Sequence, residues 1–239
     1  MTSILRLTAL AAAALLLSGP ASAAEKRYGL TSFEAIEVNV DVNVEVVTRA
    51  PVSAVATGSA DALDRLTLET RDGRLVIGEK KYAGDENRRA QSGAVTVRVN
   101  AANLKSATLA GSGTLRIDQL KGARVMIALR GPGQISVGDI ATDRLNVAMI
   151  GNGTMTLAGK AKQGQMMLSG AGVVDAGKLA VDDLISDSEG AGDHIFNAVK
   201  TAAITSRGVG KAVVLGRPAC TVRNLGSGTV TCGPAKLAP

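Results

Sequence analysis

The residues with the clearest potential for chemistry lie around His194, the single histidine of the chain. Five carboxylates stand just upstream of it, Asp182, Asp183, Asp187, Glu189 and Asp193. Imidazole and carboxylate groups together can ligate zinc or manganese, or exchange protons with a substrate. Such a site needs several converging ligands, whereas a lone histidine beside Ser186 and Ser188 is more often a hydrogen-bonded core residue. We therefore expect no metal ion, no cofactor and no catalytic role at this position.

Other residue types used in catalysis are present without their partners. Ser112 and Ser227 lie within Gly-Ser-Gly, but the Gly-x-Ser-x-Gly elbow of hydrolases is absent and no histidine is placed to activate either serine. Enzymes built on β-helices need clustered carboxylates, or an Arg or Lys base, on one outward face. The acids of the glycine-rich half do not cluster in this way, because they stand at different offsets from the nearest glycines: Asp118, Asp139, Asp143 and Asp175. No catalytic residue is predicted.

Cys220 and Cys232 near the C-terminus are the only cysteines. In an exported protein, two cysteines at this spacing favour a disulfide over a buried reduced pair. A bridge that closes so short a loop contributes roughly 2 to 3 kcal/mol through the lost entropy of the unfolded chain. We expect the bridge, as a staple at the end of the repeats described next.

The order of these residues in space is set by a Gly-x-Gly tripeptide that returns seven times. The pairs are Gly111 and Gly113, Gly131 and Gly133, Gly151 and Gly153, Gly170 and Gly172, Gly190 and Gly192, Gly208 and Gly210, and Gly226 and Gly228. A period of 18 to 20 residues with apolar runs on both sides of each pair is typical of a solenoid. We predict an all-β protein, a parallel β-helix of about seven coils whose corners are formed by these glycines, through a positive φ or a close approach of the backbone.

Side-chain alternation shows which residues of each coil point inward. Apolar residues recur at fixed positions before and after each glycine pair, as at Leu109, Leu115 and Ile117, and polar residues such as Arg116 lie between them. Cys220 and Cys232 fall on these inward positions in the last coil. Alternation with a period of two on both sides of a glycine corner predicts strands that stack coil upon coil.

The segment before the repeats is also predicted to be β-structure. From Phe33 the chain alternates strictly, and residues 36–46 form one half-buried strand; further strands are expected around Leu66, Leu75 and Val97, with a hairpin turn at Asp72-Gly73. Only Ser59 to Arg65 is compatible with a helix. The predicted organisation is a signal peptide over 1–23, N-terminal strands that open the solenoid over 24–103, the repeat region over 104–232 and a tail over 233–239.

The predicted signal peptide indicates export. One cation, a short apolar run, a helix breaker and Ala21-Ser22-Ala23 form its parts. No later apolar stretch is long enough to span a bilayer, so we expect a periplasmic, cell-surface or extracellular protein without a transmembrane segment. The cations are spread along the chain; Lys80, Lys81, Arg88 and Arg89 could touch lipid headgroups or acidic glycans, although a solvated loop is the simpler reading. Four aromatic residues are too few for a nucleic-acid platform.

Three passages resemble the auto-transporter adhesin, head GIN domain family. They are Phe33-Glu34-Ala35-Ile36-Glu37-Val38, Asp72-Gly73-Arg74-Leu75-Val76-Ile77, and Leu104-Lys105-Ser106-Ala107-Thr108-Leu109-Ala110-Gly111-Ser112-Gly113. The resemblance extends from about residue 33 to residue 231. It implies a right-handed β-solenoid of the bacterial envelope with a role in adhesion, and it supplies no catalytic motif.

Two functions remain open at this stage. The first is a non-catalytic envelope or surface protein whose long β faces bind an envelope glycan or a protein, through side chains or by addition of a strand to an edge. The second is a glycan-active β-helix enzyme whose site is unrecognised. The first is preferred, because the sequence shows neither an outward acid cluster nor aromatic residues that could stack on sugars.

Overall fold

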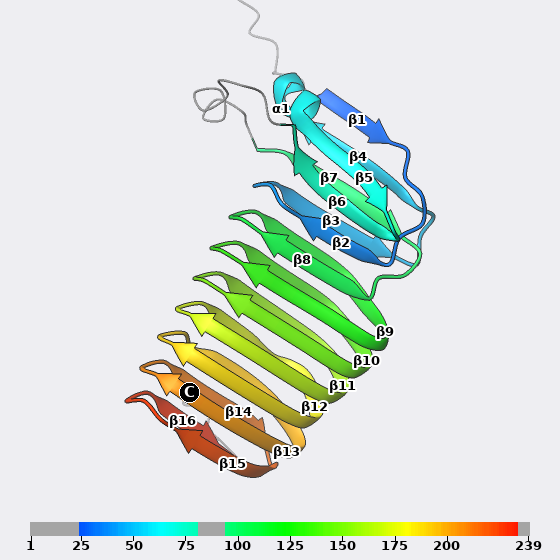
Figure 1. Ribbon diagram of the computed structural model, residues 1–239. Coiled ribbons are helices and arrows are strands. Elements are labelled where there is room, and N and C mark those ends of the chain that lie inside the picture. The colour runs from blue at the N-terminus through cyan, green and yellow to red at the C-terminus, as the bar shows by residue number, and fades with distance from the viewer. Residues whose placement is uncertain (1–23, 81–93, 234–239) are drawn as a thin grey trace, which may run out of the picture.

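The computed structural model describes residues 24–80 and 94–233. The predicted signal peptide, the cations Lys81, Arg88 and Arg89, and residues 234–239 of the predicted tail lie outside the described residues. Within them the chain forms sixteen strands and one short helix. The strands build a β-solenoid of about six turns with stacked parallel coils, as the glycine period predicts (Figure 1).

Five long strands form the body of the solenoid, and each follows almost one full coil. They are β9 (Thr114–Arg130), β10 (Gln134–Ile150), β11 (Thr154–Gly170), β12 (Val173–Gly190) and β13 (His194–Gly208). Neighbouring coils pair in parallel, so that Ile135 lies beside Leu115 on one side and Met155 on the other. Each strand bends midway and passes from one wall of the solenoid to the other (Figure 1).

The glycine pairs lie at the opposite corner, between the end of one long strand and the start of the next. Seven corners bound six repeats, which is why seven pairs accompany about six turns. The first glycine of each of five pairs has a positive φ, a conformation that favours glycine: Gly111, Gly131, Gly151, Gly170 and Gly190. Gly208 and Gly226 lack a positive φ, and there the constraint is space: a Cβ would collide with the carbonyl oxygen of the glycine one coil before.

The second glycine of each pair also lies at the corner, but none of the seven has a positive φ. These second glycines therefore do not form the bend through a backbone conformation that only glycine favours. A Cβ on the second glycine would collide with the carbonyl oxygen of the second glycine one coil before, at Gly133, Gly153, Gly172, Gly192, Gly210 and Gly228. Gly113 has no such predecessor and meets the carbonyl oxygen of Val42 instead. Of the two roles expected for the glycines, these seven residues thus serve only the close approach of the backbone.

The core is a set of columns that run along the solenoid axis. Leu115, Ile135 and Met155 form one column and Leu109, Leu129 and Met149 another, all buried. The predicted inward alternation is correct through β14, where Ala212 and Val214 are buried, and fails in the last coil. There Val222, Asn224 and Cys220 occupy inward columns but are exposed, because no described strand lies beyond them.

The N-terminal section joins the same walls. Residues 36–46, which we expected to form one strand, are two: β2 (Ala35–Val38) and β3 (Asn43–Thr48), which lie on opposite walls with a corner at Asp41 between them. β2 pairs with β6 (Arg74–Glu79) and β8 (Ser106–Ala110), and β3 pairs with β7 (Thr96–Ala101) and β9. Alternation stays in phase through the corner, so it cannot reveal the bend.

Antiparallel strands and the helix complete the N-terminal end. β1 (Ala24–Tyr28) pairs with β4 (Ser53–Gly58), and β5 (Leu66–Arg71) forms the expected hairpin with β6 through Asp72 and Gly73, both at positive φ. α1 (Ala60–Arg65) begins after Ser59, whose side chain accepts a hydrogen bond from the Ala62 amide. Its buried Ala62 and Leu63 cover the end of the core.

The C-terminal end is built differently. β14 (Lys211–Gly216) pairs with β13 and with β16 (Thr229–Cys232), and β15 (Ala219–Asn224) pairs with β13. Together β15 and β16 are the two walls of the last coil (Figure 1). The described part of the chain contains no helix with the length and hydropathy of a membrane span.

Candidate binding surfaces

His194 is a core residue of the coil that β13 forms. Its side chain is 5% exposed, and burial lowers its pKa from 6.5 to about 4, although the neighbouring Asp193 acts in the opposite direction. Nδ1 of this histidine has no hydrogen-bond partner among the described residues. The hydroxyl of Ser186 likewise has none, whereas Ser188 donates weakly to the Thr205 carbonyl oxygen at 3.4 Å.

The acids that precede His194 in sequence point away from it. Asp182 pairs with Lys200 at 2.8 Å, Asp183 accepts a hydrogen bond from the Thr201 hydroxyl, and the Asp193 carboxylate accepts one from the Lys211 amide. Among the described residues no three His, Cys, Asp or Glu side chains stand close enough together to hold a metal ion. The sequence neighbourhood of His194 is therefore not a spatial cluster.

The four scattered aspartates serve the bend of each coil. Asp118 accepts hydrogen bonds from the amide and hydroxyl of Thr48, and the Gln119 side chain donates to Asp139 at 2.7 Å. Asp143 pairs with Lys162 at 2.7 Å, and Asp175 accepts a hydrogen bond from the Gly177 amide. These carboxylates hold turns and neighbouring side chains. Asp143 also lines a hollow of about 670 Å³ together with Asp182, and each of these two acids is paired with a lysine, Asp143 with Lys162 and Asp182 with Lys200.

Ser112, at the first glycine corner, also has a structural contact. The Ser112 amide donates to Asp41 at 2.7 Å, which ties the first repeat to the N-terminal section. A hollow of about 390 Å³ lies beside this corner, between α1 and the start of β3. Of the charged residues that line it, Arg65 and Glu79 pair with each other across 3.4 Å, and Asp41 accepts the hydrogen bond from the Ser112 amide. Ser112 faces no histidine, because the single histidine is buried several coils away.

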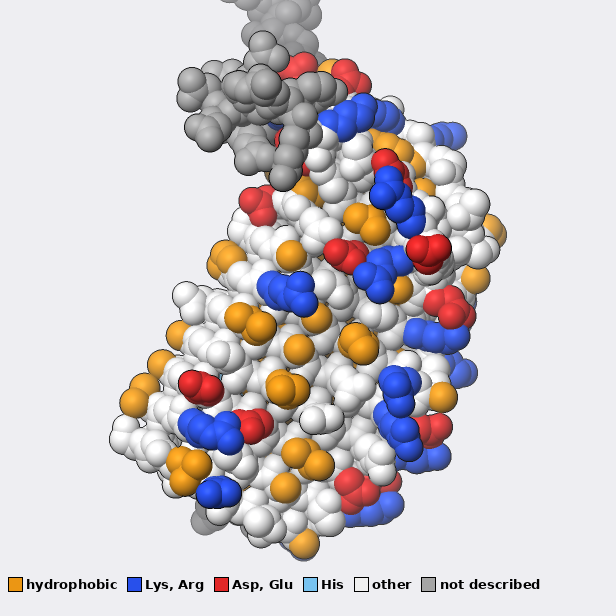
Figure 2. Space-filling model, viewed as in Figure 1, with side chains coloured by type: hydrophobic (Ala, Val, Ile, Leu, Met, Phe, Trp, Pro, Cys, Tyr) orange, Lys and Arg blue, Asp and Glu red, His pale blue; other side chains and the backbone are white. Residues whose placement is uncertain are grey.

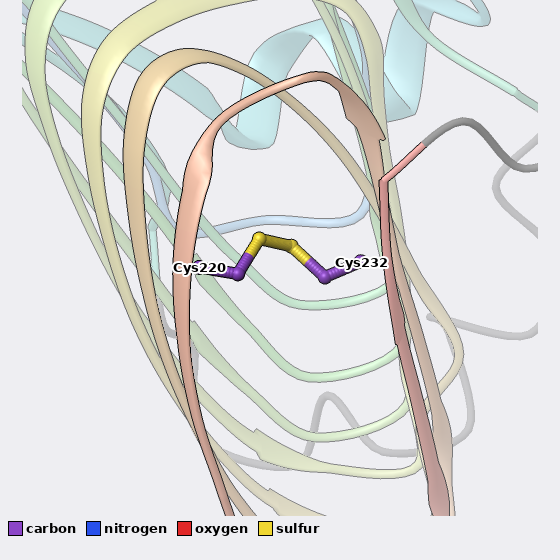
Figure 3. Close-up of a disulfide and its surroundings, with 2 residues drawn as sticks. All are labelled: Cys220 and Cys232. Carbon is purple, nitrogen blue, oxygen red and sulfur yellow. A yellow bond between two sulfur atoms is a disulfide. The ribbon is translucent and has the colours of Figure 1, made fainter.

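The two cysteines form the predicted disulfide. Cys220 belongs to β15 and Cys232 to β16, and their bond crosses from one wall of the last coil to the other (Figure 3). The Cα atoms are 6.6 Å apart. Both cysteines continue the inward columns of the coils before them, as we expected. Cys220 is nevertheless solvent-exposed, because no further coil follows in the described chain.

The most extensive candidate surface is the front face, defined as the outward side of β5, β6, β2, β8, the second halves of β9 to β13, and β15. Apolar side chains gather in its middle, over β9 to β12 (Figure 2). The large ones are about half exposed or more: Met126, Ile150, Met167 and Ile185. Ala128, Ala148 and Met167 pair in consecutive coils, so they connect these side chains into one patch. Sequence reasoning missed this apolar patch, although its signal is legible as apolar residues at outward positions.

A shallow groove of about 600 Å³ borders the apolar patch and runs along the solenoid axis across β10 to β13 and β15. Its rim carries the amide side chains of Asn146, Gln163 and Gln165. Gly164 also lines the groove, and its missing side chain makes room on the core side, where a Cβ would stand only 2.9 Å from the buried Val181. Because Ile185 lines both the groove and the apolar patch, the two form one continuous binding surface with apolar and hydrogen-bonding parts.

Charge is distributed unevenly between the two ends of the chain. The cations are spread along the sequence as we expected, but no Asp or Glu follows Asp193, whereas six of the 27 Lys and Arg residues do. The chain up to Asp193 is therefore neutral, with 21 groups of each sign, and the net charge of +6 lies entirely after it. The C-terminal coils are a cationic end.

A family model matches residues 32–218, with the description "Putative auto-transporter adhesin, head GIN domain". The match spans the N-terminal section and nearly all of the repeats. It agrees with the resemblance seen in the three sequence passages. Among curated proteins, none matches the chain.

Solved structures share the solenoid fold at low sequence identity. A protein from Bacteroides fragilis described as a "putative adhesin" has a TM-score of 0.78 at 20% identity, over 89% of this chain and 98% of its own. A second "putative adhesin", from Parabacteroides merdae, has a TM-score of 0.70 at 19% identity, over 90% and 97%. A "putative lipid binding protein" from Parabacteroides distasonis has 0.70 at 18%, over 90% and 98%. At these identities the likeness shows the fold alone.

Proposed function

This chain belongs to the auto-transporter adhesin, head GIN domain family, and from that membership we propose that it is an exported adhesin-like protein of the cell envelope or surface, one that binds a partner and catalyses no reaction. The partner that we propose is an envelope glycan or an envelope protein. The names of the similar structures, two adhesins and one lipid-binding protein, support a binding role.

The observation that carries the proposal is the apolar patch on the front face. Large apolar side chains that are exposed close together on one face, unlike singly scattered ones, often mark a binding site. Met167 is 60% exposed and Ile185 58%, and both stand on rigid, paired strands with buried residues on either side. A surface that is already ordered loses little conformational entropy when it binds.

The engaged carboxylates support a non-catalytic role. A glycosidase needs two acids that face one substrate, one of them held protonated. Here Asp143 is bound to Lys162 and Asp175 to a backbone amide of its own turn. Incubation of the purified protein with acidic and neutral envelope polysaccharides should release no new reducing ends; release that depends on one of these aspartates would replace the binding role with the enzymatic one.

The binding role can be tested with labelled protein, residues 24–239, added to isolated cell envelopes of the producing bacterium. A double variant with Met167→Glu and Ile185→Glu should bind at least about tenfold more weakly, because buried interface anchors dominate affinity. Val173→Glu is the matched control, since Val173 also lies on β12 and is 43% exposed but points from the opposite wall. Equal binding by the double variant and the unchanged protein would contradict the proposal.

Location is tested separately. Cell fractionation should place the protein in the envelope, and protease added to intact cells should distinguish a surface protein from a periplasmic one. Recovery in the cytoplasmic fraction at the size of the full chain would contradict export.

A further inference from the structure

The two ends of the solenoid are finished in different ways. At the N-terminal end, α1 covers the core with Ala62 and Leu63, and the outermost strands β1 and β5 are antiparallel additions to β4 and β6. These outer strands carry charges of both signs, such as Glu69 and Arg71, which pair with each other. Mixed charges on an edge strand discourage the addition of another strand.

The C-terminal end has no such cover among the described residues. Among the described strands, β15 pairs only with β13 and β16 only with β14, so each has an edge whose backbone groups are not paired within the described part of the chain. All six residues of β15 are exposed. Val222 continues the column of the buried Ile204 but is itself 44% exposed. Within the described residues the hydrophobic core is therefore uncovered at this end, apart from the disulfide that crosses it (Figure 3).

The charge around this edge is of one sign. Two of the six cations after Asp193 pair with acids of an earlier coil, Lys200 with Asp182 and Arg207 with Asp187. For Lys211, Arg217 and Arg223 the described residues provide no salt bridge. Arg217 stands just before β15, and Arg223 is its next-to-last residue. A second copy of the chain, joined end to end by a two-fold axis, would bring these cations together, and like charges oppose that assembly.

We propose that the free edge of β15 is a docking site for an acidic, extended polypeptide that adds to it as a further strand. Backbone hydrogen bonds to Ala219–Asn224 supply the pairing. Alternate apolar side chains of the added strand cover Val222 and the disulfide, and its carboxylates lie on the other side, near Arg223. Opposite charges on neighbouring strands stabilise such pairing.

The edge of β15 lies beyond the apolar patch on β9 to β12, although Ala219, Cys220 and Thr221 also line the end of the groove. The Met167→Glu and Ile185→Glu variant should keep its affinity for the acidic peptide, so failure of this site can be distinguished from failure of the proposed function. The test uses the full mature chain, residues 24–239, with its disulfide closed. Three short capped peptides serve as probes: alternating valine and glutamate, alternating valine and lysine, and alternating proline and glutamate. The proline peptide has the same charge as the first but cannot pair as a central strand, because proline lacks the amide hydrogen.

The valine–glutamate peptide should bind and should slow hydrogen exchange of the amides in residues 219–224. The lysine and proline peptides should bind at least about tenfold more weakly. Arg223→Glu should lower the affinity for the valine–glutamate peptide about tenfold and raise the affinity for the valine–lysine peptide. Arg130 is also exposed and on the front face but lies several coils away, so Arg130→Glu should change neither affinity.

Three outcomes would overturn the proposal. Equal affinity for the valine–glutamate peptide and the proline–glutamate peptide would show that charge alone is recognised. Binding to vesicles of phosphatidylglycerol, lost in Arg223→Glu and accompanied by no peptide binding, would assign the end to anionic lipid. A dimer in size-exclusion chromatography that dissociates in Arg223→Glu would assign the edge to a second copy of the chain.

Discussion

The carbonyl oxygen of Gly133 occupies the place where a side chain at position 153 would begin. A Cβ on Gly153 would stand 2.5 Å from that oxygen and from a methyl carbon of Leu129. The same relationship recurs at the other corners, where the backbone of one coil lies directly against the backbone of the next. The glycine pairs thus set how closely the coils can stack.

Gly153→Ala should lower the stability of the solenoid by about 1 to 3 kcal/mol, the usual cost of forcing an extra carbon into a packed site. Thermal melting followed by circular dichroism measures the change, as a fall of several degrees in the midpoint. Gly29→Ala is the control, because a Cβ at Gly29 meets nothing within 4 Å and should leave the midpoint nearly unchanged. Equal midpoints for the two variants would contradict the packing role of the corner.

His194 should make the protein less stable in mild acid. The pKa of His194 is about 4 in the folded chain because burial disfavours the charged imidazolium, whereas the unfolded chain has the ordinary value of 6.5. Between these values the unfolded state binds more protons, so stability falls as the pH falls from 6.5 to 4. By linkage the full loss is about 3 kcal/mol.

The measurement is the unfolding midpoint at several pH values for the unchanged protein and for His194→Leu. As the pH falls towards 4, the unfolding midpoint of the unchanged protein should fall further than that of His194→Leu. Val174→Ala, which alters the residue paired with His194 one coil earlier, should destabilise equally across the same pH range. A constant difference between the histidine and leucine proteins would refute the lowered pKa.

A chelator should leave the melting midpoint unchanged. The acids near His194 in sequence are bound to Lys200, Thr201 and Lys211, so they do not converge on the imidazole. Calorimetry with and without EDTA, followed by added zinc, tests this expectation. If EDTA lowered the melting midpoint and added zinc restored it, the fold would depend on a bound metal ion, and this prediction would be wrong.

Reduction of the Cys220–Cys232 bond should loosen the last coil before the rest. Each coil depends mainly on its neighbours, so hydrogen exchange should become faster over residues 219–232 and stay slow in β10. Titration of the denatured protein without reductant should detect no free thiol. Two thiols per chain would refute the bridge in the exported protein, and unchanged exchange after reduction would refute its stabilising role.

The sequence predicts the repeats well because two independent periods agree there. The glycine spacing gives the length of a coil, and alternation gives the inward column, as for Leu115, Ile135 and Met155. The corner at Asp41 was missed since alternation passes through a bend without a change of phase. Alternation shows whether a side chain faces the core or the solvent, but not whether the chain turns between two such residues.

The binding surfaces were less predictable for a related reason. Parity identifies Met167 and Ile185 as outward residues, yet only the paired strands show that they lie close together on neighbouring coils. Alternation places Val222 and Cys220 in inward columns, yet both are exposed. Burial depends on whether another coil follows, which alternation does not show. His194 sits in an apolar column, and its missing hydrogen bond at Nδ1 depends on distances that spacing does not contain.

The glycine corners also restrict how the length of this protein can change. An insertion or deletion inside a coil would displace every later glycine from the carbonyl oxygen against which it packs, and would move outward residues into the core. Gain or loss of one whole repeat, such as residues 134–153, would preserve both the corner contacts and the columns, since each repeat presents the same backbone to the next. Variation in length among natural or engineered versions should therefore come in steps of one coil, with the apolar patch and the groove growing or shrinking by one row at each step.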